Sequence, residues 1–217
     1  MEEVLAAITL ALAALAGLTY FAILPKPSGH VRAVWKTLPV SMLALYAFLM
    51  NAPSPLVMAL VLSALGDAFL AYDGKHNFAA ALVSFLIAHV AYGWLFFMFG
   101  DRALVVAEIW RLGAAIVSVA LVIALVAYLW RSAASLAPAV LAYATAIASM
   151  AVLSLSMPSL VVFAGVALFL SSDAVLSVQT FKMERTDPLW PFAAFYVWAS
   201  YFGAQVGLTI ALVALTA

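Results

Sequence analysis

Two acidic side chains fall inside long apolar stretches of the sequence, at Asp67 and at Asp173. A charged side chain at the centre of a bilayer costs at least about 2.5 kcal/mol, so such residues are rare and usually functional. Burial disfavours the ionised form of a carboxyl group, and two neighbouring carboxyl groups ionise in separate steps. Such a pair can supply one proton donor and one anion at neutral pH, which is what general acid and base catalysis requires.

The two aspartates are expected at the same depth. Each lies a few residues before the cytoplasmic end of its stretch, roughly 10 Å from the boundary at 1.5 Å per residue. The matching runs Asp-Ala-Phe-Leu and Asp-Ala-Val-Leu begin at positions 67 and 173, an offset of 106 residues. This offset favours a parallel internal repeat of four helices, with a pseudo-two-fold axis along the membrane normal. We therefore expect the two carboxylates to share one lipid-accessible cavity.

A purely structural role would have each aspartate neutralise a cation. No basic residue lies within either stretch, and the nearest ones, Lys36, Lys75 and Lys182, are expected at the interface. Intramembrane carboxylates without a cation in their span are functional by default, so we favour a functional role. Lys36 could bind a phosphate head group from its interfacial position, although snorkelling alone would also explain it.

Several polar residues are candidates for lining the same cavity. His89 shares a helical face with Tyr92, and Gln205 shares one with Tyr201 by their spacing. An amide in lipid needs hydrogen-bond partners, whereas histidine and tyrosine often only pack against or bond a neighbouring helix. The candidate substrate-binding residues are Lys36, His89, Tyr92, Tyr143, Ser172, Tyr201 and Gln205.

The sequence lacks the patterns that are typical of metal, phosphate and serine or cysteine nucleophile sites. The chain has no cysteine, which removes disulfides, thiolate nucleophiles and Cys-ligated metals. Asp67, Asp173 and His89 could together ligate a metal, but no metal-ligand spacing such as His-Glu-x-x-His occurs. Glycine-rich phosphate loops and Gly-x-Ser-x-Gly elbows are also missing. We therefore expect neither a metal nor another cofactor.

The elements that must position these residues follow from composition. Of 217 residues 69% are apolar and 8% charged, against about 25% charged in a soluble domain. A net charge of zero leaves no electrostatic footprint for nucleic acid. We predict an all-α integral membrane protein, a single domain over residues 1–217 with eight transmembrane helices. The apolar stretches are Val4–Leu24, Leu38–Met50, Leu56–Tyr72, Phe78–Phe99, Leu112–Trp130, Ala139–Met157, Leu160–Phe181 and Phe192–Leu215. The second is short unless its helix begins near Val34 and includes Lys36, whose long side chain can snorkel to the interface.

Loop charges predict the orientation. With eight spans both termini share a side, which sees Arg102 and Arg111, while the other side sees the remaining 7 of the 9 basic residues. Because the excess of Lys and Arg marks the cytoplasmic face, both termini are expected outside. We expect a multi-pass protein of a prokaryotic cytoplasmic membrane. The sequence leaves the oligomeric state open.

The chain also resembles the YhhN family of lysoplasmalogenases. The first signature of that family is similar to Gly66-Asp67-Ala-Phe-Leu70 followed by Phe78-x-x-Ala81-x-x-x-Phe85-x-x-x-His89-x-x-Tyr92. Its second resembles Gly165-x-x-x-Phe169-x-x-Ser172-Asp173-x-x-Leu176, and its remaining polar landmarks resemble Lys36-x-x-Pro39 and Tyr201-x-x-x-Gln205. Ala81 departs from the pattern, since the family favours glycine there.

The resemblance implies a membrane-embedded hydrolase. Its reaction is hydrolysis of the vinyl ether bond of lysoplasmalogens, which releases a fatty aldehyde and glycerophosphoethanolamine or glycerophosphocholine. Such a bond breaks when an acid protonates the outer alkene carbon and water captures the oxocarbenium ion. Asp67 and Asp173 fit the acid and the stabilising or water-activating anion, in either order, as paired carboxylates do in glycosidases. The partners implied are a lysophospholipid substrate and membrane lipids.

Two other classes of protein fit the same residues. A proton-coupled transporter or channel also uses paired intramembrane carboxylates and internal repeats. No stretch is interrupted in its middle beyond short Gly or Ser steps, which argues only mildly against transport. A structural membrane protein could use the aspartates simply to hold helices together.

Overall fold

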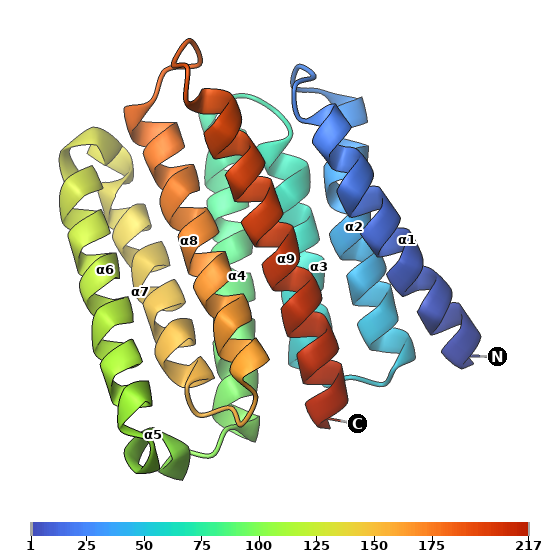
Figure 1. Cartoon of the computed structure of the whole chain (residues 1–217). Helices are drawn as coiled ribbons and strands as arrows, with labels where there is room; N and C mark the ends of the chain where they lie inside the picture. Colours follow the sequence, from blue (N-terminus) through green and yellow to red (C-terminus); the bar gives the residue numbers. More distant parts are fainter. Residues whose placement is uncertain (1, 217) are drawn as a thin grey trace. The chain divides into compact units, whose positions relative to one another are not determined.

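The computed structural model describes residues 2–216, and every regular element in that range is helical. Figure 1 shows these helices joined by short connections. Their bounds are α1 Glu2–Ile23, α2 His30–Leu49, α3 Ser54–Leu70, α4 Lys75–Phe99, α5 Ala103–Ala107, α6 Ile109–Ala133, the 3₁₀ turn η1 Ala134–Leu136, α7 Ala137–Ser154, α8 Leu160–Lys182 and α9 Trp190–Thr216.

One long helix covers each apolar stretch identified in the sequence. Of the two starts considered for the second helix, the longer is correct: α2 begins at His30, before Val34, and includes Lys36. Proline lies in the first turn of α3 and of α7, where a missing backbone N–H is tolerated. The side chain of Ser159 caps α8 by accepting a hydrogen bond from the Val161 amide at 3.2 Å. The all-helical prediction is confirmed.

Five helical segments are long and apolar enough to cross a membrane: α1, α4, the run over 109–154 that contains α6 and α7, α8 and α9. These make the chain a multi-pass membrane protein by length and composition. The helix α3 is apolar but shorter, with 17 residues. The prediction of eight spans is therefore supported in part, and the orientation of the termini stays a prediction.

The chain forms two compact units, and the boundaries between them fall inside α4 and α9. Unit 1 contains residues up to Tyr92 and from Gln205 onward, and in it α2 packs against both α1 and α3. Unit 2 contains residues 93–204, and in it α7 packs against both α6 and α8. Each unit carries one of the two aspartates, Asp67 in unit 1 and Asp173 in unit 2. The single domain and the four-helix repeat stay predictions.

A buried arginine holds the end of α7 in unit 2. Arg111 is 3% exposed, and its Nη1 donates to the carbonyl oxygens of Leu155 at 2.7 Å and Met157 at 2.8 Å. Terminal carbonyls of a helix lack partners within the helix, so this guanidinium satisfies groups that lipid could not. Its Nε donates to Glu108 at 3.0 Å, and this bond, with a second from Trp110, holds the pKa of Glu108 below its usual value.

Replacing Arg111 with methionine should destabilise the protein, because the two carbonyls would lose charged donors worth about 1.5–3 kcal/mol each. We expect the apparent Tm in detergent to fall by roughly 5 °C or more. Arg131→Met, an exposed arginine at the other end of α6, is the matched control and should change the Tm little. Equal shifts in the two variants would contradict the capping role.

Candidate functional site

Asp67 forms an ion pair with Lys36 in unit 1. The distance from Lys36 Nζ to Asp67 Oδ1 is 3.3 Å, and Asp67 is 1% exposed while the lysine side chain is 12% exposed. The expectation that no cation reaches this aspartate is wrong. Because α2 begins at His30, Lys36 lies within the helix that packs against α3, and its four-carbon chain spans the remaining gap.

The ion pair fixes the charge state of Asp67. A lone carboxylate buried away from water would favour its neutral form, whereas an adjacent ammonium stabilises the anion. At 3.3 Å in a low-dielectric interior the attraction between two unit charges is far stronger than at a protein surface. Asp67 is therefore the ionised carboxylate of this unit.

A close contact between α3 and α4 lies beside Asp67. A Cβ atom added to Gly66 would lie 2.5 Å from the ring of Phe85, so the glycine allows α3 to approach α4 closely. Phe85 is 7% exposed and lies one turn before His89, which is fully buried. The glycine beside the aspartate thus sets the spacing of the two helices that carry Asp67 and His89.

Tyr92 and Gln205 form a second polar pair in unit 1. The Tyr92 hydroxyl donates to Gln205 Oε1 at 2.6 Å, and both residues are fully buried. The Nε2 of Gln205 has no hydrogen-bond partner among the described residues. Since a buried amide needs partners, this donor is available to a ligand oxygen. The structure thus brings together two residues that the sequence analysis placed on separate helices.

Asp173 in unit 2 accepts a hydrogen bond from a tyrosine. The Tyr143 hydroxyl on α7 donates to Asp173 Oδ2 on α8 at 2.6 Å. The neighbouring Ser172 donates its hydroxyl to the carbonyl of Val197 at 2.9 Å, which ties α8 to α9. The buried ring of Tyr201 packs edge-on against Phe169, with centroids 5.3 Å apart. Tyr143 thus contacts the carboxylate directly.

The partners of the two aspartates lie at similar separations along the chain, although they differ by one residue in register. Lys36 precedes Asp67 by 31 residues, and Tyr143 precedes Asp173 by 30. In each unit the partner comes from the helix before the one that carries the aspartate. The four-helix repeat stays a prediction; what the structure shows is that Asp67 contacts a cation and that Asp173 contacts a neutral hydroxyl.

The sequence analysis missed Ser63. Its hydroxyl is fully buried, has no partner among the described residues and lies one turn before Asp67 on α3. The spacing of four residues between a serine and an aspartate in an apolar stretch was the available signal. The part of the chain that the structure describes contains no group of three His, Cys, Asp or Glu side chains arranged to hold a metal.

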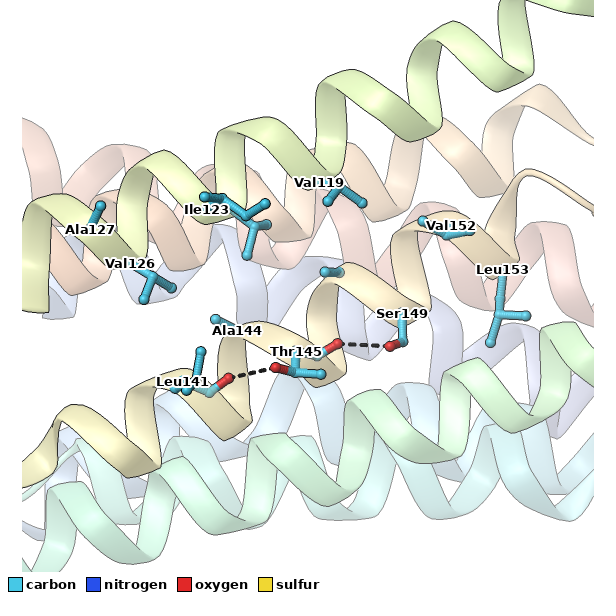
Figure 2. A pocket seen from close by; sticks show the side chains of 12 residues that line it. Val119, Ile123, Val126, Ala127, Leu141, Ala144, Thr145, Ser149, Val152 and Leu153 are labelled. Atoms are coloured by element: carbon cyan, nitrogen blue, oxygen red, sulfur yellow. Dashed lines mark hydrogen bonds between the residues drawn. The ribbon is translucent and has the colours of Figure 1, made fainter.

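An open groove of about 760 Å³ lies between α6 and α7 in unit 2 (Figure 2). Valine, isoleucine, leucine and alanine side chains form most of its wall. Its two polar residues, Thr145 and Ser149, donate their hydroxyls to the carbonyls of Leu141 and Thr145 on their own helix. The groove therefore presents an apolar surface, and neither aspartate lines it.

Substituting Gly66 with alanine should disturb the α3–α4 contact, because the new methyl group would overlap the ring of Phe85. Overpacking of this kind costs about 1–3 kcal/mol, which should appear as a lower Tm. Gly113 on α6 has open space around its Cβ position, so Gly113→Ala should leave stability unchanged or slightly higher. Equal Tm values for Gly66→Ala and Gly113→Ala would contradict the prediction.

Removing one member of the ion pair should be more damaging than removing both. Lys36→Met leaves a buried carboxylate without its cation, a change that costs about 3–5 kcal/mol in other buried pairs. We expect Lys36→Met to lower the Tm by roughly 10 °C, and Asp67→Asn added to it to recover part of that loss. The exposed Lys75→Met serves as control. Strictly additive losses would show that the two side chains are not coupled.

Comparison with known proteins identifies the family to which the chain belongs. A family model for the YhhN family matches residues 31–212, which include both aspartates as well as Lys36 and Tyr143. No curated protein and no solved structure gives a significant match. The match covers well over half of the chain, so the protein belongs to the YhhN family, whose known activity is that of a lysoplasmalogenase.

Proposed function

We propose that the protein is a membrane-embedded lysoplasmalogenase. It hydrolyses the vinyl ether bond of a lysoplasmalogen to a fatty aldehyde and glycerophosphoethanolamine or glycerophosphocholine, with Asp67 and Asp173 as acid and base. The observation that carries the proposal is a fully buried, ion-paired carboxylate at Asp67 in a chain of this family. A second carboxylate, Asp173, is held by a tyrosine hydroxyl.

The chemistry explains why two carboxyl groups are needed. The slow step is proton transfer to the outer alkene carbon, which turns the ether into an oxocarbenium ion. A protonated carboxyl group supplies that proton, and an anion stabilises the cation and accepts a proton from the attacking water. Side chains that hold the proton donor and acceptor in place raise the rate of hydrolysis further, because the reactants are already oriented when they bind.

Two features of the structure suit a single-chain lipid as the substrate. The apolar groove between α6 and α7, which neither aspartate lines, offers an apolar surface to an alkenyl chain. The Nε2 of Gln205, fixed by Tyr92, is a donor for an oxygen of the substrate. We assign His89, Tyr143, Ser172 and Tyr201 to the wall of the substrate site.

The test is aldehyde release by the purified protein in detergent, given a lysoplasmalogen and a coupled aldehyde assay. Asp67→Asn and Asp173→Asn should each lower kcat by at least about 100-fold while the Tm stays measurable. Asp101→Asn makes the same change at an exposed loop aspartate and should retain full activity. Retained turnover in both catalytic variants would overturn the assignment of the carboxylates.

The same preparation separates the enzyme from a transporter. An enzyme releases aldehyde in detergent without any gradient, whereas transport requires sealed vesicles. Absence of aldehyde release in detergent, together with uptake into vesicles that depends on Asp67, would overturn the proposed function. A folded protein that does neither would favour the structural role for the two aspartates.

A further inference from the structure

An arginine near the start of α2 lies one helical turn from the ion pair of unit 1. Resting on the proposed function, we propose that Arg32 binds the phosphate of the lysophospholipid substrate, and that Tyr20 is the positioning residue that orients its guanidinium. The phosphate contact thereby falls to Arg32 and not to Lys36. All four residues of this argument, Tyr20, Arg32, Lys36 and Asp67, belong to unit 1.

Lys36, the cation that the sequence suggests for the phosphate, is engaged elsewhere. Its Nζ lies 3.3 Å from Asp67 Oδ1, and its side chain is only 12% exposed. A phosphodiester anion keeps its water at the membrane interface, because transfer of an anion to an apolar interior is costly. A phosphate on Lys36 would have to lose that water and compete with a buried carboxylate for the ammonium. Lys36 therefore suits the inner end of the site better than its phosphate end.

The guanidinium of Arg32 is oriented and keeps most of its donors. Its Nε donates to the hydroxyl of Tyr20 at 3.2 Å, and Tyr20 is fully buried on α1. Arg32 makes no other hydrogen bond or ion pair among the described residues, so the N–H groups of Nη1 and Nη2 remain for a ligand. Arg32 is half-buried, which leaves this end of the guanidinium open to the interface. Its two parallel donors fit two oxygens of one phosphate.

Helix stability does not explain an arginine at this position. Arg32 is in the first turn of α2, where the helix dipole disfavours a positive charge. No acidic residue lies in that turn to offset the cation. A phosphate bound to Arg32 would bring a negative charge to a place where the side chain and the helix dipole both favour one.

The spacing along α2 fits the length of the substrate. Lys36 follows Arg32 by four residues, which is a rise of about 6 Å on nearly the same helical face. The arginine side chain adds to this separation, because side chains tilt toward the start of their helix. In a lysoplasmalogen about seven bonds, or roughly 8 Å, separate the phosphorus from the outer alkene carbon. A lipid with its phosphate on Arg32 therefore brings its vinyl ether to the level of Asp67.

Two substrates that differ only in the head group test this contact. A lysoplasmalogen carries the phosphate, whereas a 1-alkenylglycerol has the same vinyl ether without it. Arg32→Gln should raise KM for the lysoplasmalogen by about tenfold or more, because charged hydrogen bonds to the phosphate are lost. The kcat should change little, since the contact is made equally in the ground state and the transition state. KM for the alkenylglycerol should stay the same.

Two further variants separate phosphate binding from a general effect on the fold. Tyr20→Phe removes the hydroxyl that orients Arg32, so it should raise KM for the lysoplasmalogen by a smaller factor and leave the alkenylglycerol unaffected. Arg131→Gln makes the same change at an exposed arginine of unit 2 and should alter neither KM. In Arg32→Gln, an equal rise of KM for both substrates, or no rise for the lysoplasmalogen, would overturn the proposed contact.

A binding measurement tests the same contact without catalysis. A saturated 1-alkyl lysophospholipid has no vinyl ether to hydrolyse, and it should raise the Tm of wild type more than the matching alkylglycerol does. Arg32→Gln should abolish this difference. Inorganic phosphate should have little effect, and a Tm shift as large as that from the lysophospholipid would overturn the assignment to a lipid head group. If wild type shows the lipid-dependent shift but releases no aldehyde, the proposed function is overturned while the phosphate contact is supported.

Discussion

The ion pair between Lys36 and Asp67 is the interaction on which the rest of the site depends. A carboxylate that is ionised at 1% exposure needs a compensating charge, and Lys36 supplies it from a helix packed against α3. This requirement accounts for the extension of α2 to His30, which brings charged residues into an otherwise apolar helix. Gly66 allows the close packing that buries the carboxylate.

The two aspartates have different neighbours. In unit 1 the cation of Lys36 contacts Asp67, and the buried hydroxyl of Ser63 lies one turn away on the same helix. In unit 2 the hydroxyl of Tyr143 donates to Asp173, and Phe169 lies one turn before that aspartate. The two aspartates therefore lie in chemically different surroundings.

The sequence predicted the helices well because apolar runs, prolines and short polar connections determine where a membrane helix begins and ends. It also singled out Asp67 and Asp173, since a carboxylate in an apolar run stands out at once. It did not predict the ion pair, because the long side chain of Lys36 reaches a neighbouring helix and such reach has no signature in residue spacing. The free hydroxyl of Ser63 was missed for a related reason, since only the structure shows which helical serines bond to their own backbone.

Infrared spectroscopy of the carboxyl groups tests the central claim most directly. A protonated buried carboxyl gives a band that an ionised one lacks, and asparagine substitution identifies its owner. The account predicts that Asp67 is ionised near neutral pH, so Asp67→Asn should leave this band unchanged. A band that is lost only when Asp67 is replaced would contradict it.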